Sequence, residues 1–184
     1  MKKRIETALM VLFIALSSAY AQIDSRADIR FGVARTILGT GDIRTTTFES
    51  EFNYKINSFF ATAVSLNYGL GDEQTFGTAS YVQGNTNVFI SPFRNTRVFD
   101  FRIGGGLSYY IVSDVTAQNV GCGSFGCIAN EYDYVRRREF GYNIITEVAY
   151  QLDEKFLLGL KLYTQPYFNG DINSGLMVKF GFKI

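Results

Sequence analysis

The chain has 184 residues, with 18 Lys and Arg against 17 Asp and Glu, and 19% charged residues, fewer than the ~25% of an average soluble domain. This balance excludes a strongly basic nucleic-acid-binding surface and an acidic disordered tail. The absence of His excludes Ser-His and Cys-His nucleophile pairs and His-ligated zinc, so no cofactor, no metal and no catalytic residues are expected.

Residues 1–21 have the pattern of a cleaved secretory signal peptide. Positive residues 2–4 precede a short apolar run at 8–16, and Ala-Tyr-Ala at 19–21 gives a small-x-small cleavage pattern. The apolar run is far shorter than the ~20 residues of a membrane-spanning helix. We therefore expect export through the Sec pathway and a single mature domain, residues 22–184.

The mature sequence alternates large apolar and small or polar residues almost throughout, which predicts strands with two different faces. Most of these segments exceed the roughly 5–6 residues of a typical strand and match the ~9–11 residues that cross a bilayer at a tilt. The predicted strands lie near residues 29–34, 47–56, 60–69, 79–90, 98–112, 139–151, 158–163 and 176–184.

The connections between these strands alternate between short and long. The short ones are 57–58, 91–97 and 153–155; the longer ones are 36–44, 71–78, 113–138 and 166–174. Outer-membrane barrels have short periplasmic turns and long extracellular loops. The pattern predicts eight strands with both termini in the periplasm.

The polar face carries mainly Gly, Ala, Ser, Asn and Gln, which suits the narrow lumen of an eight-stranded barrel. Its acids and bases occur in equal number, which predicts an ion network inside the lumen because an unpaired buried charge is costly. These residues are Asp28, Arg30, Glu49, Glu51, Lys55, Asp100, Arg102, Glu139, Glu147, Lys161, Lys179 and Lys183.

The opposite face carries large apolar residues, more than a small lumen could hold, so we expect it to face lipid. Its aromatic residues gather towards strand ends, as in the girdles of outer-membrane barrels. They are Tyr68, Tyr109, Phe140 and Tyr142 at the loop end, and Tyr54, Phe60, Phe99 and Tyr150 at the turn end.

The signal, the alternating strands and the closing GLMVKFGFKI resemble the small outer-membrane β-barrel proteins of Gram-negative bacteria, the OmpA/OmpX/OmpW-like group. The resemblance implies an all-β, eight-stranded antiparallel up-and-down transmembrane β-barrel in the outer membrane. It also implies a monomer in contact with outer-membrane lipid and lipopolysaccharide, and assembly by the barrel-assembly machinery. In such families the last strand usually ends in an aromatic residue, whereas this chain ends in Ile184, with Phe182 on the same face.

Two glycine-rich segments have competing interpretations. Residues 121–126 match G-x-G-x-x-G, but a dinucleotide site needs a strand-turn-helix context, so we expect a flexible external loop. Gly104, Gly105 and Gly106 lie within a strand, where they relieve crowding in the lumen or permit a bend. Cys122 and Cys127 fall in the longest loop, and a disulfide between them is the expectation for an exported protein.

Three further motifs each allow two interpretations. Glu49 and Glu51 could form an acid/base pair, but bases on the same face favour the ion network. Arg136, Arg137 and Arg138 are candidate contacts for lipopolysaccharide phosphate, the alternative being the solvated base of a loop. Residues 169–171, Asn-Gly-Asp, indicate a turn rather than a calcium site.

The function expected from these features is that of a non-enzymatic integral outer-membrane protein, acting through its extracellular loops or as a structural element. One alternative is a porin-like narrow channel or carrier for small molecules, hydrophobic ones included. Another is a soluble periplasmic ligand-binding barrel.

Overall fold

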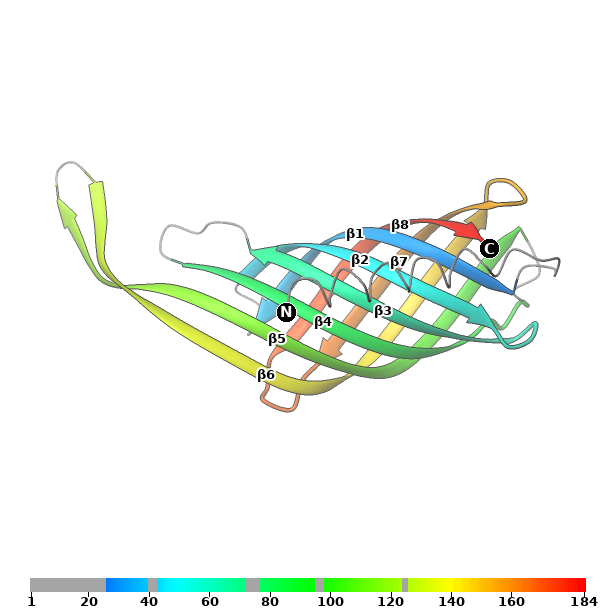
Figure 1. Cartoon of the computed structure of the whole chain (residues 1–184), viewed down its shortest axis with the longest axis horizontal. Coiled ribbons are helices and arrows are strands. Elements are labelled where there is room, and N and C mark those ends of the chain that lie inside the picture. Colours follow the sequence, from blue (N-terminus) through cyan, green and yellow to red (C-terminus); the bar gives the residue numbers. More distant parts are fainter. Residues whose placement is uncertain (1–25, 40–42, 72–76, 95–97, 124–125) are drawn as a thin grey trace, which may run out of the picture.

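The chain folds into a closed barrel of eight antiparallel strands in sequence order (Figure 1). The computed structural model describes residues 26–39, 43–71, 77–94, 98–123 and 126–184, with the backbone alone for 77 and 116–132. The predicted signal peptide, 1–21, lies outside them. The strands are β1 (Ala27–Gly39), β2 (Ile43–Lys55), β3 (Phe60–Gly71), β4 (Gly77–Ile90), β5 (Phe99–Gly123), β6 (Gly126–Gln151), β7 (Phe156–Pro166) and β8 (Ile172–Lys183). Within the described ranges, no helix is long and apolar enough to cross a membrane.

The two predicted faces of the strands are confirmed. On β2, Phe48 and Phe52 are 48% and 42% exposed, whereas Glu49 and Glu51 between them are 3% and 1% exposed. The same alternation runs along β1, β3, β7 and β8. Successive side chains point to opposite faces of a strand, so closing the sheet encloses the polar face and leaves the apolar face outside.

The register between neighbouring strands is shifted around the barrel. A row of directly paired residues that starts at Ala27 on β1 returns to β1 at Ile37, nearer the loop end. The row passes through Tyr54, Thr62, Val88, Gly105, Ile144, Thr164 and Ser174. This stagger is the tilt that barrel closure requires.

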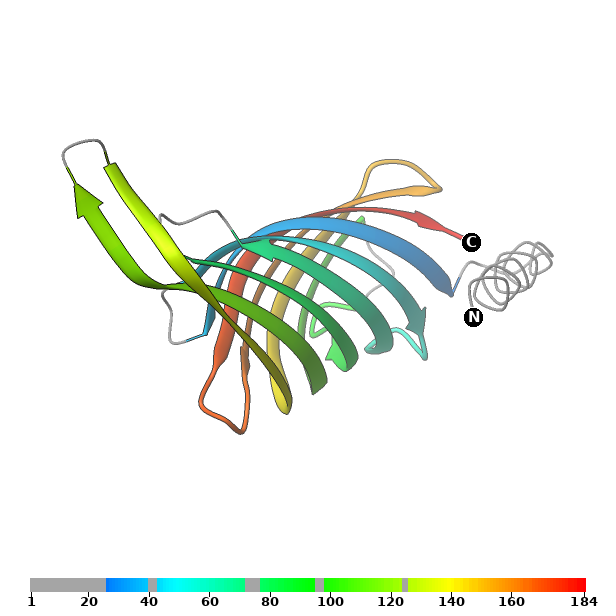
Figure 2. The same cartoon turned by 60° about the vertical axis from the view of Figure 1, so that its left-hand side comes forward.

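The predicted loop 113–138 is wrong. β5 and β6 continue through it as a paired hairpin, from Ser113 opposite Arg136 to Gly123 opposite Gly126. In Figures 1 and 2 this hairpin, coloured green to yellow, extends far beyond the other strands. Strand alternation could not reveal it, because beyond the lipid both faces of a ribbon meet water and the contrast between them disappears.

Of the segment that matches G-x-G-x-x-G, residues 121–123 end β5 and residue 126 begins β6, so the flexible loop predicted for these four residues is wrong. Residues 124 and 125 lie outside the described residues. Cys122 and Cys127 are directly opposite each other in the backbone register. Their side chains lie outside the described residues, so their disulfide stays a prediction.

The outer face carries the aromatic residues where the sequence placed them. Tyr109 and Phe140 are paired across β5 and β6 with ring centroids 4.7 Å apart at the loop end. Phe99 and Tyr150, 50% and 48% exposed, are paired at the turn end. Leu66, Leu107 and Leu162, on strands around the wall, are each at least 59% exposed, which a protein surrounded by water would not tolerate as a continuous surface.

Crowding in the lumen explains two of the three consecutive glycines. A Cβ on Gly104 would lie 2.4 Å from Cδ1 of Phe89, and one on Gly106 would lie 2.0 Å from the carbonyl oxygen of Thr86. Gly105 points outward, where its Cβ would meet only the carbonyl oxygen of Asn143 at 3.4 Å. The inward glycines thus leave room for the side chains that fill the barrel.

Candidate functional site

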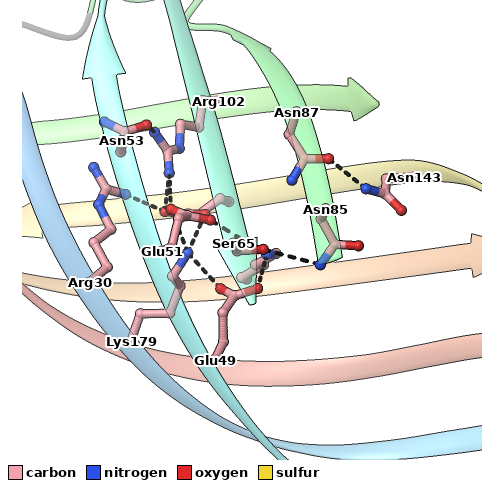
Figure 3. A network of polar contacts seen from close by, with 12 residues as sticks. Arg30, Glu49, Glu51, Asn53, Ser65, Asn85, Asn87, Arg102, Asn143 and Lys179 are labelled. Carbon is pink, nitrogen blue, oxygen red and sulfur yellow. Dashed lines mark hydrogen bonds and ion pairs between the residues drawn. The ribbon is translucent and has the colours of Figure 1, made fainter. Parts of the chain in front are cut away.

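The centre of the lumen holds a network of enclosed charges, part of which is drawn in Figure 3. Acids and bases occur in it in equal number. No member is more than 3% exposed. We call this group the central network: Asp28, Arg30, Glu49, Glu51, Arg102, Glu147, Lys161 and Lys179. β1, β2, β5, β6, β7 and β8 contribute to it, because each presents polar residues inward.

Glu147 on β6 joins three cations from three other strands. Its Oε1 accepts from Arg30, which also pairs with Asp28. The same oxygen lies 2.8 Å from Nη2 of Arg102, and its Oε2 lies 3.4 Å from Nζ of Lys179. The carboxylate of Glu147 therefore compensates the charges of cations from β1, β5 and β8.

Glu49 and Glu51 complete the network from β2. Lys161 Nζ donates to Glu49 Oε2 at 2.6 Å, and Lys179 Nζ lies 3.0 Å from Glu49 Oε1 and 2.8 Å from Glu51 Oε1. Arg102 Nη2 lies 3.3 Å from Glu51 Oε1. Since both carboxylates are held between cations, the structure supports the ion network over an acid/base pair.

Arg102 is held by packing as well as by charge. Its guanidinium lies 4.0 Å from the centroid of the Phe89 ring, a cation–π distance. Nη1 donates to Asn53 Oδ1 at 2.6 Å. The ring and the amide fix the side chain across the lumen, from β5 towards β2.

Four of the residues predicted for the ion network lie towards the two ends of the barrel, away from its centre. Lys55, Asp100 and Lys183 sit at the turn end of the barrel, where Lys183 Nζ donates to Gln151 Oε1 at 2.8 Å. Glu139 is part-exposed near the loop end, and its carboxylate accepts from the backbone N–H of Phe140 at 3.0 Å. Alternation along the strands predicts the correct face for these residues. Their position along the barrel axis, which alternation does not predict, decides which charges meet.

A layer of neutral polar side chains lies between the central network and the loop end. Gln83 Nε2 donates to Gln165 Oε1 at 2.7 Å, and Asn173 Nδ2 donates to Gln83 Oε1 at 3.0 Å. Asn85 Nδ2 donates to Ser65 Oγ at 3.0 Å. The two bonds of Gln83 cross the lumen from β4 to β7 and β8, so side chains also fill the lumen between the charges and the loop end.

A second charged cluster, missed by the sequence reasoning, joins the hairpin base to the connection between β7 and β8. We call it the loop-end clasp: Tyr110, Asp114, Arg137, Asn169 and Asp171. Arg137 Nη1 donates to Asp171 Oδ1 and Oδ2 at 2.8 and 2.7 Å, and Arg137 also pairs with Asp114. The Tyr110 hydroxyl donates to Asp171.

The predicted turn at 169–171 positions this clasp. The backbone N–H of Asp171 donates to Asn169 Oδ1 at 3.0 Å, and Gly170 has a φ of 91°, which favours glycine. The turn thus directs the Asp171 carboxylate inward to the hairpin. Among the described residues, no group of three or more His, Cys, Asp or Glu could hold a metal ion.

The three consecutive arginines divide between the two faces of β6. Arg137 points inward into the clasp, whereas Arg136 and Arg138 are exposed on the outer face above Phe140. Burial lowers the pKa of the Arg137 guanidinium, but the charges of Asp114 and Asp171 outweigh this effect and raise it. The cation is therefore retained, and only Arg136 and Arg138 remain candidates for external anions.

Comparisons with known proteins support the fold. No protein-family model and no curated protein sequence match the chain. Among solved structures, the Neisserial surface protein NspA has a TM-score of 0.63 at 12% identity, covering 86% of this chain and 96% of that one. The outer membrane protein Ail of Yersinia pestis has a TM-score of 0.60 at 9% identity, covering 88% and 100%.

The outer membrane enzyme PagL also matches, with a TM-score of 0.52 at 10% identity, covering 85% of this chain and 99% of that one. The chain therefore has the fold of the small eight-stranded outer-membrane β-barrels, in agreement with its apolar exterior. Because this fold carries enzymes as well as other proteins, it does not by itself decide the activity.

Proposed function

We propose that this protein is a non-enzymatic, non-conducting barrel of the Gram-negative outer membrane, and that it acts at the cell surface through the β5–β6 hairpin. The apolar exterior and the outer-membrane proteins that share the fold support this location. The observation that carries the proposal is the contrast between a lumen filled by charges and a hairpin that extends beyond the wall.

The filled lumen argues against a porin-like channel. An eight-stranded barrel has an interior just wide enough for side chains to fill. Here Arg102, Lys161 and Lys179 cross that space and meet carboxylates from facing strands. A solute would have to separate these enclosed ion pairs, at a cost of several kcal/mol each.

β5 and β6 are the longest of the described strands, and their hairpin offers a surface for contacts outside the membrane. β4 pairs with β5 only as far as Thr116, and the continuous ladder between β6 and β7 ends at Ile144. Beyond Thr116 and Asp133, which lie opposite each other, the two strands extend as a two-stranded ribbon. With short turns in the periplasm, the ribbon projects from the cell, and the exposed Arg136 and Arg138 below its base are placed to meet lipopolysaccharide phosphate.

Planar-bilayer recordings test the closed lumen. The refolded full chain should give no stable current beyond the bare membrane, whereas a wide porin in the same chamber should conduct. Large, stable openings of the wild-type protein would refute the non-conducting part of the proposal and favour the channel alternative.

Cysteine labelling on intact cells tests which end is outside. In a Cys122→Ser, Cys127→Ser background, Tyr134→Cys on the hairpin should react with a membrane-impermeant maleimide. Leu152→Cys, in the turn between β6 and β7, should react only after the cells are opened. The reverse labelling pattern would contradict the proposed orientation.

A further inference from the structure

The turn between β7 and β8 contains a chemically labile pair of residues, Asn169 followed by Gly170. Asn is among the thermally labile residues of proteins. It loses its side-chain amide most readily before Gly, because Gly has no side chain to shield the backbone nitrogen that attacks the amide. Both residues are exposed to solvent, so water reaches them. The turn is therefore a candidate site of spontaneous deamidation.

The reaction needs only these two residues and water. The backbone nitrogen of Gly170 loses its proton to solvent base and attacks Cγ of Asn169. A bond forms between these two atoms, the bond from Cγ to Nδ2 breaks, and Nδ2 leaves as ammonia after it takes a proton from solvent. Water then opens the five-membered imide. Attack at Cγ gives aspartate, and attack at the backbone carbonyl carbon gives isoaspartate.

Hydrogen bonds of the folded turn hold both reacting groups. The N–H of Gly170 donates to the carbonyl oxygen of Tyr167 at 3.0 Å. Nδ2 of Asn169 donates to the Tyr110 hydroxyl at 2.7 Å and to Asp171 Oδ2 at 3.0 Å. The reaction breaks all three bonds, because Gly170 gives up the proton that it donates and Asn169 gives up Nδ2. Deamidation therefore proceeds from an opened turn, and the bonds of the clasp determine how often the turn opens.

The product changes the charge of the loop-end clasp. Nδ2 of Asn169 is a donor between Tyr110 and Asp171, whereas a carboxylate in its place only accepts hydrogen bonds. The new negative charge lies beside that of Asp171, and Asp114 is a third acid against Arg137, the one cation among the five clasp residues. Like charges in contact repel. Deamidation thus weakens the connection between the hairpin base and the β7–β8 turn.

We infer that Asn169 is a site of spontaneous deamidation, that the loop-end clasp slows the reaction, and that the reaction permanently loosens the base of the β5–β6 hairpin. The change is permanent because the ammonia is lost to solvent. The site and its protection follow from the turn and its hydrogen bonds. Its effect at the cell surface rests on the proposed function, in which the hairpin is the part that acts.

Ageing of the full chain in detergent, followed by peptide mass spectrometry, tests the site. Deamidation raises the mass of the peptide that contains Asn169, and chromatography separates the aspartate and isoaspartate products. The folded wild-type protein should deamidate at least about tenfold more slowly than the same protein unfolded in urea. Tyr110→Phe removes one hydroxyl from the clasp, and this folded variant should deamidate about fivefold faster than folded wild type.

Tyr109→Phe is the matched control, because it removes the hydroxyl of the neighbouring residue on the outer face, outside the clasp. It should deamidate like wild type, and heat-modifiable gel mobility should show each variant folded. Equal rates in folded and unfolded wild type, or in Tyr110→Phe and wild type, would overturn the protection by the clasp. An intact Asn169 in the unfolded chain would overturn the site. These rates are measured in detergent, so they do not depend on the proposed location.

Amide hydrogen exchange tests the effect on the hairpin. Asn169→Asp reproduces one product, and Asn169→Ser removes the amide without adding a charge. Exchange near Ser113 and Arg136 should be about fivefold faster in Asn169→Asp than in wild type, and faster than in Asn169→Ser. The deamidated fraction of aged wild type should show the same increase over the unreacted fraction, which provides the test if Asn169→Asp does not fold. Unchanged exchange in the deamidated fraction would overturn the loosening of the hairpin.

Discussion

The central network and the loop-end clasp contain the same kind of contact, carboxylates paired with cationic side chains, in different surroundings. Glu147 in the network is fully enclosed, whereas the Arg137 side chain in the clasp is 31% exposed. Water can replace a lost partner of Arg137, but it cannot reach the partners of Glu147. Enclosure, more than the number of ion pairs, should therefore decide how much each cluster contributes to stability.

Removing one carboxylate from the centre should have the largest effect. Glu147→Gln keeps the size of the side chain but leaves Arg30, Arg102 and Lys179 with fewer anions, and should lower the free energy of unfolding by about 3–5 kcal/mol. Urea titration in detergent, followed by gel mobility, measures this loss. Glu139→Gln on the same strand should change the free energy of unfolding by less than about 0.5 kcal/mol. Equal losses in the two variants would contradict the idea that enclosure decides the contribution of a charge to stability.

The lipid face provides a third surrounding, with neither water nor partner charges. Leu160→Arg, at an outward position midway along β7, should lower the free energy of unfolding in liposomes by about 2–4 kcal/mol. Tyr134→Arg, on the hairpin beyond the apolar wall, should leave it almost unchanged. A tolerated Leu160→Arg would mean that the faces are misassigned.

The Phe89 ring supports Arg102 by packing rather than by charge, and a substitution at Gly104 tests that support separately. Gly104→Ala places a methyl group against the Phe89 ring and should lower the free energy of unfolding by about 1–3 kcal/mol. Gly84→Ala is the matched control, because its Cβ would meet open space on the outer face. The same urea titration compares them, and a Gly104→Ala variant as stable as Gly84→Ala would show that the ring is free to move.

A substitution in the loop-end clasp should have the smallest effect on the free energy of unfolding. It should instead loosen the structure locally. Asp171→Asn weakens the contact with Arg137 and should lower the free energy of unfolding by at most about 1 kcal/mol. Amide hydrogen exchange should become faster at the hairpin base near Ser113 and Arg136, but not in β2. Uniformly faster exchange would indicate that the clasp supports the whole barrel.

The sequence predicted the barrel well because lipid and lumen impose opposite demands on alternate residues. Phe48 and Glu49, or Leu160 and Lys161, could be assigned to their faces from periodicity alone. The hairpin was missed because beyond Tyr109 and Phe140 no such contrast remains. The clasp was missed because Asp171 belongs to an ordinary turn, and nothing in the sequence indicates that Arg137 meets it.

The composition of the central network was predicted only in part, for a geometrical reason. Whether a residue points into the lumen follows from its odd or even place along the strand. Its position along the barrel axis depends on strand register and tilt. Lys55 and Lys183 have the correct parity and end at the turns, whereas Lys161 and Lys179 reach Glu49 in the middle. Register around a closed barrel depends on all eight strands together, so no single segment could supply it.

The seam between the first and last strands has a consequence for how the protein folds. β1 and β8 pair from Asp28 opposite Lys183 to Gly39 opposite Ile172, so the seam cannot close until the end of the chain has been made. Lys179 on β8 reaches Glu49 and Glu51 on β2, across β1. Before closure those two carboxylates lack a partner that only the last strand brings. Pairing of β8 with β1 thus brings Lys179 to these carboxylates. The attraction between them favours closure of a barrel whose seam is still open.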